Sequence, residues 1–378
     1  MSASTSSWIV LVSKKLPRPL AGSPVSLGSF NIYYLDSGRI VVCAASEKNG
    51  RLFQFTQLNE PSVDGFAEHL DLVDRSCISV DDSSDVQNPD PIKIGGVYPL
   101  AAPPSTPVLR GGSEVKRLIA PLTFTRGEYR LIPQSEDDLE IEDLDDPDRD
   151  LATPFVTSDD DVKVASTNVL NYFQLLDKDG NKLLGQDPRG ANNEEEYMRQ
   201  VQKTFLALSI VDADIFLIVE IENSMDGSKD FVQKLNSYTG FTRNYKAVSV
   251  EAGYENIGTD VIKVDIVYDS NILELKGSAI LDDDVAQTVA PTIFDMAEEY
   301  ELNGVTTKRV FEGKSRASLA ATFSKNGNMV TVVSNHFKSK GPRNAVGKDL
   351  DQLDGQGAYN FVRTLSAQIV VEWLMTTP

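Results

Sequence analysis

The chain has 378 residues, and its 41% hydrophobic content is typical of folded globular proteins with sizeable cores. Its formal net charge of −20 argues against a module that gathers nucleic acid on a general basic surface, because phosphate contacts need Lys and Arg. No apolar run approaches the roughly 18 residues of a membrane span, and residues 1–13 lack the basic start and apolar length of a signal peptide.

Residues 1–134 have the pattern of an all-β domain. Short runs at residues 30–35, 39–44 and 51–56 are separated by turn residues, and no long helical period is visible. About five or six short strands at this spacing predict a small β-barrel-like accessory domain of the OB kind.

The two cysteines of the chain, Cys43 and Cys77, both lie in this region. They leave two interpretations open, which are a single disulfide and a pair of buried free thiols. Neither belongs to a CxxC pair, which argues against a zinc site. His69 is expected to be an ordinary surface or packed histidine.

Residues 135–161 are dense in Asp and Glu and are interrupted by Pro147 and Pro154. Like charges at this density repel one another and favour a solvated, extended segment. We therefore predict an acidic linker that acts as a flexible tether between two folded regions.

Residues 162–378 change to alternating strands and helices. Residues 162–168 are expected to form a strand, and residues 193–210 form an amphipathic helix with apolar positions at helical spacing. The continuous apolar run at residues 214–220 is typical of a central strand that is buried on both faces. Residues 262–268 alternate in polarity, which predicts a strand with one buried face.

The last part of the chain contains a hairpin signal. Asn326 and Gly327 separate two strand-like runs, and this pair suits the two positive φ angles of a tight hairpin turn. Apolar residues at helical spacing then predict a helix that continues almost to residue 378. These elements indicate an α+β chain whose second domain is an α/β sandwich.

Polar residues stand where the predicted strands end. Asn168 follows the first strand, Glu220 closes the buried strand, and His336 follows the hairpin. Strand ends that meet at one rim are a usual place for an active site. Carboxylate and amide oxygens suit Mg²⁺ or Ca²⁺, and a histidine near neutrality can donate to a phosphate or move a proton. Bound cations would reverse the local effect of the acidic charge.

These residues lie in segments that resemble the endonuclease/exonuclease/phosphatase superfamily, and in particular its bacterial extracellular nuclease subgroup. The similar segments, in chain order, are residues 50–57 and 87–91 upstream, and then residues 166–173, 212–223, 257–264, 335–341 and 351–363. Each segment alone is weak evidence for the resemblance. The evidence becomes strong because the segments occur together, in this order, along most of the chain. The resemblance implies a two-sheet α/β sandwich after an OB-like β-domain.

The resemblance also implies roles for particular residues. Glu220 would be the principal metal ligand, and Asn168 would assist at the metal or the phosphate. His336 would contact the scissile phosphate, while Asp260 and Lys263 would help to position it. Glu222 is expected to have a structural role, and Asn360 and Arg363 belong to a family motif without an assigned role.

Two later motifs of the family, Gly-Asp-x-Asn and Asp-His, have no counterpart before Pro378. The expectation is therefore a C-terminally incomplete domain, and a chain that is an inactive fragment of a longer nuclease. The implied function of the whole enzyme is hydrolysis of DNA, and of RNA as a second substrate, with Mg²⁺, Ca²⁺ or Mn²⁺. The resemblance further implies an extracellular protein, and we expect a monomer.

Two alternative functions remain open. One is a phosphomonoesterase or lipid phosphodiesterase on the same fold, because fold does not determine substrate. The other is a non-catalytic fragment whose β-domain binds a partner.

Overall fold

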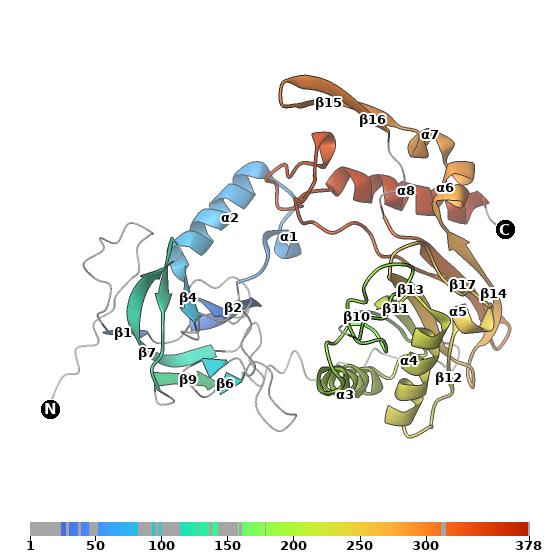
Figure 1. Ribbon diagram of the computed structural model, residues 1–378, viewed down its shortest axis with the longest axis horizontal. Coiled ribbons are helices and arrows are strands. Elements are labelled where there is room, and N and C mark those ends of the chain that lie inside the picture. Colours follow the sequence, from blue (N-terminus) through green and yellow to red (C-terminus); the bar gives the residue numbers. More distant parts are fainter. Residues whose placement is uncertain are drawn as a thin grey trace. The chain divides into compact units, whose positions relative to one another are not determined.

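The computed structural model describes residues 24–27, 30–36, 39–44, 52–81, 93–94, 98–99, 114–125, 127–135, 138–142, 158, 161–177, 179–310 and 315–376. The chain divides into two compact units (Figure 1). Unit 1 comprises Met1–Leu151 and Gln352–Gln356, and unit 2 comprises Ala152–Asp351 and Gly357–Pro378. The change of unit after Leu151 falls inside the segment predicted as a linker. The sequence did not indicate that Gln352–Gln356 joins unit 1.

The described part of unit 1 contains one seven-stranded sheet. Its strands are β1 (Pro24–Leu27), β2 (Phe30–Asp36), β3 (Arg39–Cys43), β4 (Cys77–Asp81), β7 (Glu114–Thr125), β8 (Glu128–Leu131) and β9 (Leu139–Glu142). The pairing runs from β7 through β2, β3, β4 and β8 and back to β7, so these strands close a ring. The strands predicted at residues 30–35 and 39–44 are confirmed, whereas the OB-like assignment stays a prediction. A separate pair consists of β5 (Lys93–Ile94) and β6 (Tyr98–Pro99).

The prediction of an all-β unit is wrong, because helices α1 (Phe55–Leu58) and α2 (Val63–Ser76) lie between β3 and β4. The Ser62 hydroxyl caps α2 by accepting a hydrogen bond from the Gly65 amide at 3.2 Å. His69 is buried on this helix, and its ring lies 5.8 Å from the Phe55 ring. Val63, Phe66, Leu70 and Val73 stand at helical spacing in α2, so the sequence contained a helical period that the strand-based interpretation missed.

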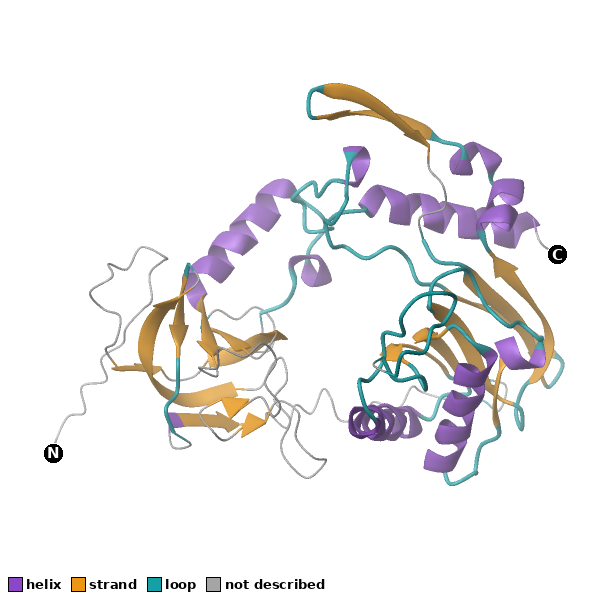
Figure 2. Ribbon diagram, viewed as in Figure 1, coloured by secondary structure: helices purple, strands orange, loops and turns teal. Residues whose placement is uncertain are grey.

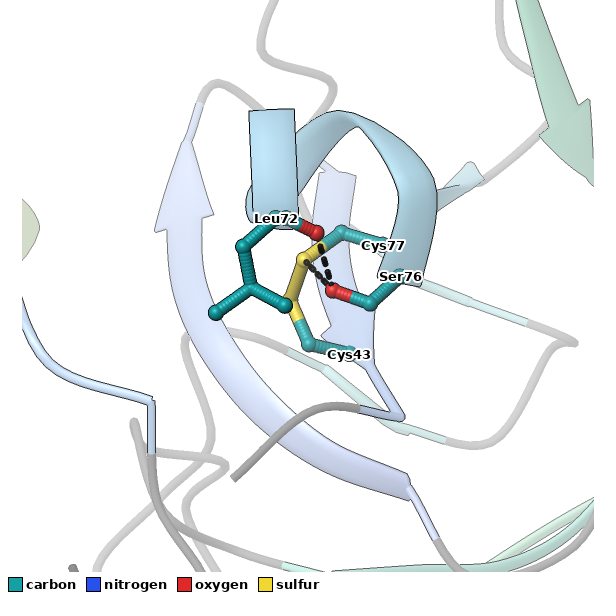
Figure 3. Close-up of a disulfide and its surroundings, with 4 residues drawn as sticks. All are labelled: Cys43, Leu72, Ser76 and Cys77. Atoms are coloured by element: carbon teal, nitrogen blue, oxygen red, sulfur yellow. Dashed lines mark hydrogen bonds between the residues drawn. A yellow bond between two sulfur atoms is a disulfide. The ribbon is translucent and has the colours of Figure 1, made fainter. Parts of the chain in front are cut away.

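Cys43 and Cys77 form a disulfide between the paired strands β3 and β4 (Figure 3). Their Cα atoms are 4.0 Å apart, because the two residues stand directly opposite each other in the register. Of the two interpretations that the sequence left open, the structure contains the disulfide. Beside it, the Ser76 hydroxyl donates to the Leu72 carbonyl at 2.5 Å.

The segment predicted as a tether contains a strand. Strand β9 pairs antiparallel with β7, and Leu139 is buried opposite Leu118. The prediction of an extended, solvated segment is therefore wrong for these four residues. One apolar side chain in the core and a ladder of backbone hydrogen bonds outweigh the repulsion between neighbouring carboxylates.

Unit 2 contains two larger sheets that face each other (Figure 1). The first sheet has the order β10 (Val164–Tyr172), β11 (Ile215–Glu222), β13 (Ile262–Asp269) and β12 (Tyr245–Ala247), in which only β10 and β11 are parallel. The second sheet has the order β14 (Glu274–Leu281), β17 (Ser318–Lys325) and β18 (Asn328–Ser334), and is antiparallel. Apolar residues from both sheets, such as Val264 and Phe323, form the core between them.

Helices cover the outer faces of the two sheets (Figure 2). On the first sheet these are α3 (Glu194–Val211) and α4 (Met225–Tyr238), and on the second sheet they are α6 (Asp283–Val289) and α8 (Asn360–Thr376). The remaining elements are α5 (Val248–Glu251), α7 (Pro291–Phe294), the hairpin of β15 (Ala297–Leu302) and β16 (Val305–Val310), and the 3-10 helix η3 (Gly347–Asp349). The layers are therefore helix, sheet, sheet and helix, consistent with the predicted sandwich.

Local signals in the sequence account for several of these elements. The Asn193 side chain caps α3 by accepting from the Glu196 amide at 2.9 Å. The hairpin of β17 and β18 turns at Asn326 and Gly327, whose φ angles are 52° and 86°. The helix predicted at residues 193–210 and the predicted hairpin are confirmed.

The prediction that residues 262–268 expose one face is wrong, because all eight residues of β13 are buried. One face of the strand meets the second sheet. The other face carries Lys263 and Asp265, and it is covered by Ser228 of α4 and Ser249 of α5. The polar residues that alternate along β13 therefore belong to a buried hydrogen-bond network and do not face solvent. Within the described residues, no helix has the length and apolar character needed to cross a membrane.

Candidate active site

The neighbouring strands β10 and β11 are both irregular near the same end. Their parallel pairing is regular as far as Asn168 and Val219, and it resumes only at Tyr172 and Ile221. Glu220 has a φ angle of 68°, and positive φ also occurs at Leu170 and Asn171. Such a backbone costs a non-glycine residue about 1–2 kcal/mol, and strained residues cluster at functional sites.

The bulge in β11 decides where Glu220 points. Phe216, Ile218 and Ile221 all belong to the core cluster beneath α3 and α4. Strict alternation would have placed Glu220 in that core. Because the bulge shifts the phase of the strand by one residue, Ile221 takes that place instead. The Glu220 carboxylate is left free to approach the second sheet.

His336 meets Glu220 from the second sheet. Its Nε2 atom lies 3.6 Å from Oε1 of Glu220, and both side chains are largely buried. The two sheets are tied together close by, where the Ser334 hydroxyl donates to the Ile218 carbonyl at 3.3 Å. The structure thus brings together two of the residues that the sequence singled out.

Two buried polar atoms just after β18 have no hydrogen-bond partner among the residues that the structure describes. They are Nδ1 of His336 and Oδ1 of Asn335. Burial, together with the Arg316 cation, lowers the pKa of His336 below its usual value, while Glu220 and Asp260 act in the opposite direction. The imidazole is therefore neutral near pH 7, and unsatisfied buried polar atoms are a mark of a functional site.

Asp260 binds two arginines beside this pair. One carboxylate oxygen accepts from Arg189 at 2.8 Å, and the other accepts from Arg316 at 2.9 Å. We refer to Glu220, His336, Asp260 and Arg316 as the polar cluster. It combines carboxylates with a cation and a neutral imidazole at the rim between the two sheets.

Arg316 was missed by the reasoning from sequence. It precedes β17 by two residues, and His336 follows β18 by two residues. The hairpin register pairs Leu319 with Ser334, so the same spacing puts Arg316 beside the residues that follow β18. The hairpin predicted from Asn326 and Gly327 implies this register, so it could have indicated Arg316 as a site residue.

Asn223 holds the loop that carries Asp260. It is fully buried, and its side-chain amide donates to the carbonyl oxygens of Ile257, Gly258 and Asp260 at 3.2, 3.2 and 2.7 Å. Its Oδ1 atom accepts from the Ile257 amide at 2.8 Å. Because these hydrogen bonds fix the backbone of the loop, Asn223 helps to position the Asp260 carboxylate.

Other predicted residues lie apart from the cluster. Lys263 is buried, and its Nζ donates to Ser249 at 3.1 Å and lies 3.7 Å from Asp265. Burial lowers the pKa of this amine, while Asp265 acts against that effect. The structure therefore places Lys263 in the layer beneath α4 and α5, without access to a phosphate at the rim.

Glu222 is also buried, and it accepts hydrogen bonds from the backbone amides of Gln174 and Leu175 at 3.0 and 3.1 Å. These contacts join the loop after β10 to β11, which is consistent with the structural role expected for Glu222. Arg363, on α8, donates to the Ala358 carbonyl at 2.7 Å. Asn360 begins the same helix.

The oxygen donors near the rim fit a hard divalent cation that keeps several waters. Glu220 supplies one carboxylate, and the neighbouring strand supplies the exposed Asn168 amide, whose Oδ1 also accepts from the Leu170 amide at 2.8 Å. In the described part of the chain, no group of three or more His, Cys, Asp or Glu side chains is placed to hold a metal. Mg²⁺ is commonly bound through one or two carboxylates together with water and substrate phosphate, so Glu220 and Asn168 are the residues that could hold it.

No protein-family model and no curated protein matches the sequence. The chain aligns with an endonuclease/exonuclease/phosphatase from Bacteroides vulgatus at 13% identity and a TM-score of 0.28, over 56% of this chain and 58% of that one. A humanized D. rerio TDP2 aligns at 13% identity and a TM-score of 0.29, over 57% of each chain.

A functionally unknown conserved protein from Enterococcus faecalis aligns at 11% identity and a TM-score of 0.28, over 57% of this chain and 61% of that one. This chain thus spans less than two thirds of the length of each of these structures. The function proposed below rests on the geometry of the polar cluster.

Proposed function

We propose that this protein hydrolyses phosphodiester bonds in DNA with the help of a divalent cation, as an extracellular member of the endonuclease/exonuclease/phosphatase superfamily. The observation that carries the proposal is the approach of Glu220 and His336 to 3.6 Å from two different sheets. The bulge that turns the Glu220 carboxylate toward His336 also gives Glu220 a positive φ, which has a conformational cost, and such strain is frequent at functional sites.

The side chains of the polar cluster have complementary tasks. Arg316, held by Asp260, offers guanidinium N–H groups to the oxygens of a phosphate. The neutral His336 donates a hydrogen bond to a phosphoryl oxygen or accepts a proton. Because both groups are fixed before substrate arrives, they stabilise developing charge without reorganisation.

Glu220 and Asn168 would hold the cation, which is most simply Mg²⁺, with Ca²⁺ or Mn²⁺ as substitutes. When bound, the cation would polarise the phosphoryl oxygen and stabilise the charge that develops on it. The proposed role of these two residues is therefore to bring the cation to the rim beside His336.

Two further features support the proposal. The two facing sheets with outer helices are the architecture implied by the resemblance. The disulfide between Cys43 and Cys77 supports an extracellular setting, because disulfides persist in oxidising compartments.

Plasmid nicking in the presence of Mg²⁺ tests the proposal. Glu220→Gln and His336→Ala are each expected to lower the rate by about 100-fold or more, as for loss of a main catalytic group. The matched control is Glu274→Gln, an exposed carboxylate on β14 that pairs with Lys276. Undiminished cleavage by both site variants would refute the site.

A second arm separates the alternative functions. Cleavage of DNA is compared with release of phosphate from a small phosphomonoester under the same conditions. A preference for the monoester would replace the nuclease by a phosphatase acting at the same polar cluster.

A further inference from the structure

An open cavity of about 480 Å³ lies beside the polar cluster, between the irregular end of β10 and helix α3. Its lining contains three cations, Arg189, Arg199 and Lys203, and one carboxylate, Glu196. We call it the basic cavity. Two of these cations pair with carboxylates, Arg189 with Asp260 at 2.8 Å and Arg199 with Glu195 at 3.3 Å, whereas Lys203 is exposed on α3.

The basic cavity adjoins the polar cluster through Arg189. Arg189 lines the cavity and donates to Asp260 at 2.8 Å, and Asp260 in turn holds Arg316. The opposite wall begins at Val169, directly after Asn168. Arg189 and the segment that follows Asn168 therefore place the cavity next to the cluster.

The wall of the cavity is held in a defined shape. The Gln200 side-chain amide donates to the carbonyl oxygens of Val169 and Leu170 at 3.2 and 2.9 Å. These bonds support the positive φ of Leu170, whose side chain is 75% exposed at the edge of the cavity. The cations Arg199 and Lys203 lie four residues apart, on one face of α3.

We propose that the basic cavity binds a backbone phosphate of the same nucleic-acid strand, next to the bond that is cleaved. This inference rests on the proposed function. Arg199 and Lys203 contact the phosphate, and the exposed Leu170 offers an apolar surface to the sugar. The consequence is a preference for polymeric DNA over small diesters, because a small diester fills the cluster and leaves the cavity empty.

The charge and placement of the cavity favour a nucleic-acid strand over an acidic peptide. A strand bound for hydrolysis already puts one phosphate at Arg316, and its next phosphates follow at fixed spacing along the backbone. An acidic peptide has no phosphodiester to occupy the polar cluster. Phosphate contacts by Lys and Arg also increase affinity without reading sequence.

The double variant Arg199→Gln/Lys203→Gln tests the proposal. Its kcat/KM is measured for an oligonucleotide and for bis(p-nitrophenyl) phosphate, with Mg²⁺, and the ratio of the two values is expected to fall about tenfold. The control is Lys229→Gln/Lys246→Gln, which removes two charges elsewhere in unit 2, where they pair with Asp226 and Glu251. Its ratio is expected to match that of the wild type, which separates a local effect from net charge.

Binding provides a readout that does not need catalysis. Anisotropy of a labelled single-stranded DNA of about 12 nucleotides is measured in EDTA over a range of salt concentrations. Loss of two phosphate contacts is expected to flatten the dependence of log K on log salt by about 1.4. The control double variant is expected to keep the wild-type slope.

The outcomes distinguish the two proposals. If the wild type cleaves DNA while the Arg199/Lys203 variant keeps both the substrate ratio and the salt slope, the cavity proposal is overturned and the nuclease stands. If the wild type cleaves neither substrate, the proposed function fails, and the salt slope alone decides whether the cavity binds phosphate. A reduced ratio with a flattened slope supports both.

Discussion

Asp260 and Arg316 join the two sheets of unit 2 at the candidate site. The Nε and terminal nitrogen atoms of Arg316 both lie 2.9 Å from one oxygen of Asp260. Asp260 stands in the loop before β13 of the first sheet, whereas Arg316 stands just before β17 of the second. The arginine that faces His336 is thus oriented by a residue of the opposite sheet.

This contact makes Asp260 a positioning residue whose effect passes through Arg316. We expect Asp260→Asn to lower kcat/KM for DNA about tenfold or more, because loss of a charge-assisted pair costs about 1.5–3 kcal/mol. The double variant Asp260→Asn/Arg316→Gln should lose no more than Arg316→Gln alone. Losses that add in the double variant would show that Asp260 acts independently of Arg316.

The strained backbone at Glu220 predicts a trade-off between stability and activity. Glu220→Gly and Glu220→Ala both remove the carboxylate, but only glycine adopts a φ of 68° without strain. We expect both variants to be inactive, and the glycine variant to be more stable than the alanine variant by about 1 kcal/mol. Urea unfolding measures the difference, and equal stabilities would show that the bulge is not strained.

Gln200 should stabilise the end of β10. Gln200→Ala removes the donor shared by the Val169 and Leu170 carbonyls, so we expect a loss of about 1–2 kcal/mol in the free energy of unfolding. Hydrogen exchange of residues 169–173 should accelerate as well. The control is Gln202→Ala, at an exposed position of α3, where a change within about 0.5 kcal/mol is expected. Equal effects at the two positions would contradict this role.

The ion pairs of Arg243 should make a pH-dependent contribution to the free energy of unfolding. It pairs with the buried carboxylates Asp214 and Asp269 and with Asp212, at 3.0, 3.1 and 2.7 Å. Its hydrogen bond is the largest cause of the lowered pKa of Asp212, with Lys163 adding to it. A carboxylate with a depressed pKa contributes stability above its unfolded pKa, and that contribution is lost as pH falls through the folded value.

Arg243→Gln is therefore expected to destabilise the protein by about 3–5 kcal/mol near neutral pH, since it leaves two buried carboxylates without their cation. At about pH 3 the difference from the wild type should be smaller. The share that belongs to Asp212 is reduced by solvent screening, because this side chain is 45% exposed. Denaturant unfolding at both pH values checks the direction. A difference that grows on acidification would contradict it.

The disulfide should stabilise unit 1 selectively. Cys43 and Cys77 are 34 residues apart, so closing that loop is worth about 3–4 kcal/mol in the chain-entropy account. We expect Cys43→Ser/Cys77→Ser to lower the calorimetric transition of unit 1 while the transition of unit 2 is unchanged. Reduction of the wild type should have the same effect. A shift of both transitions would show that the units unfold together.

Elements whose signals are local can be predicted from the amino-acid sequence. The cap at Asn193, the Asn326–Gly327 turn and the apolar run of β11 each involve interactions within a few residues, so they are visible in the pattern. The position of His336 just after β18 also follows from this pattern, whereas β11 continues two residues beyond Glu220, where a strand end was predicted. That these side chains lie at one rim was expected from the strand ends.

The contacts that the site residues make depend on the tertiary structure. The bulge that turns Glu220 out of the core depends on the pairing of β11 with its neighbours, and the burial of Lys263 depends on the helices that cover it. Arg316 becomes a site residue because the hairpin register sets it beside His336 and Asp260 orients it from the other sheet. These are contacts between distant segments, and their energy depends on shape and register, which no short stretch of sequence contains.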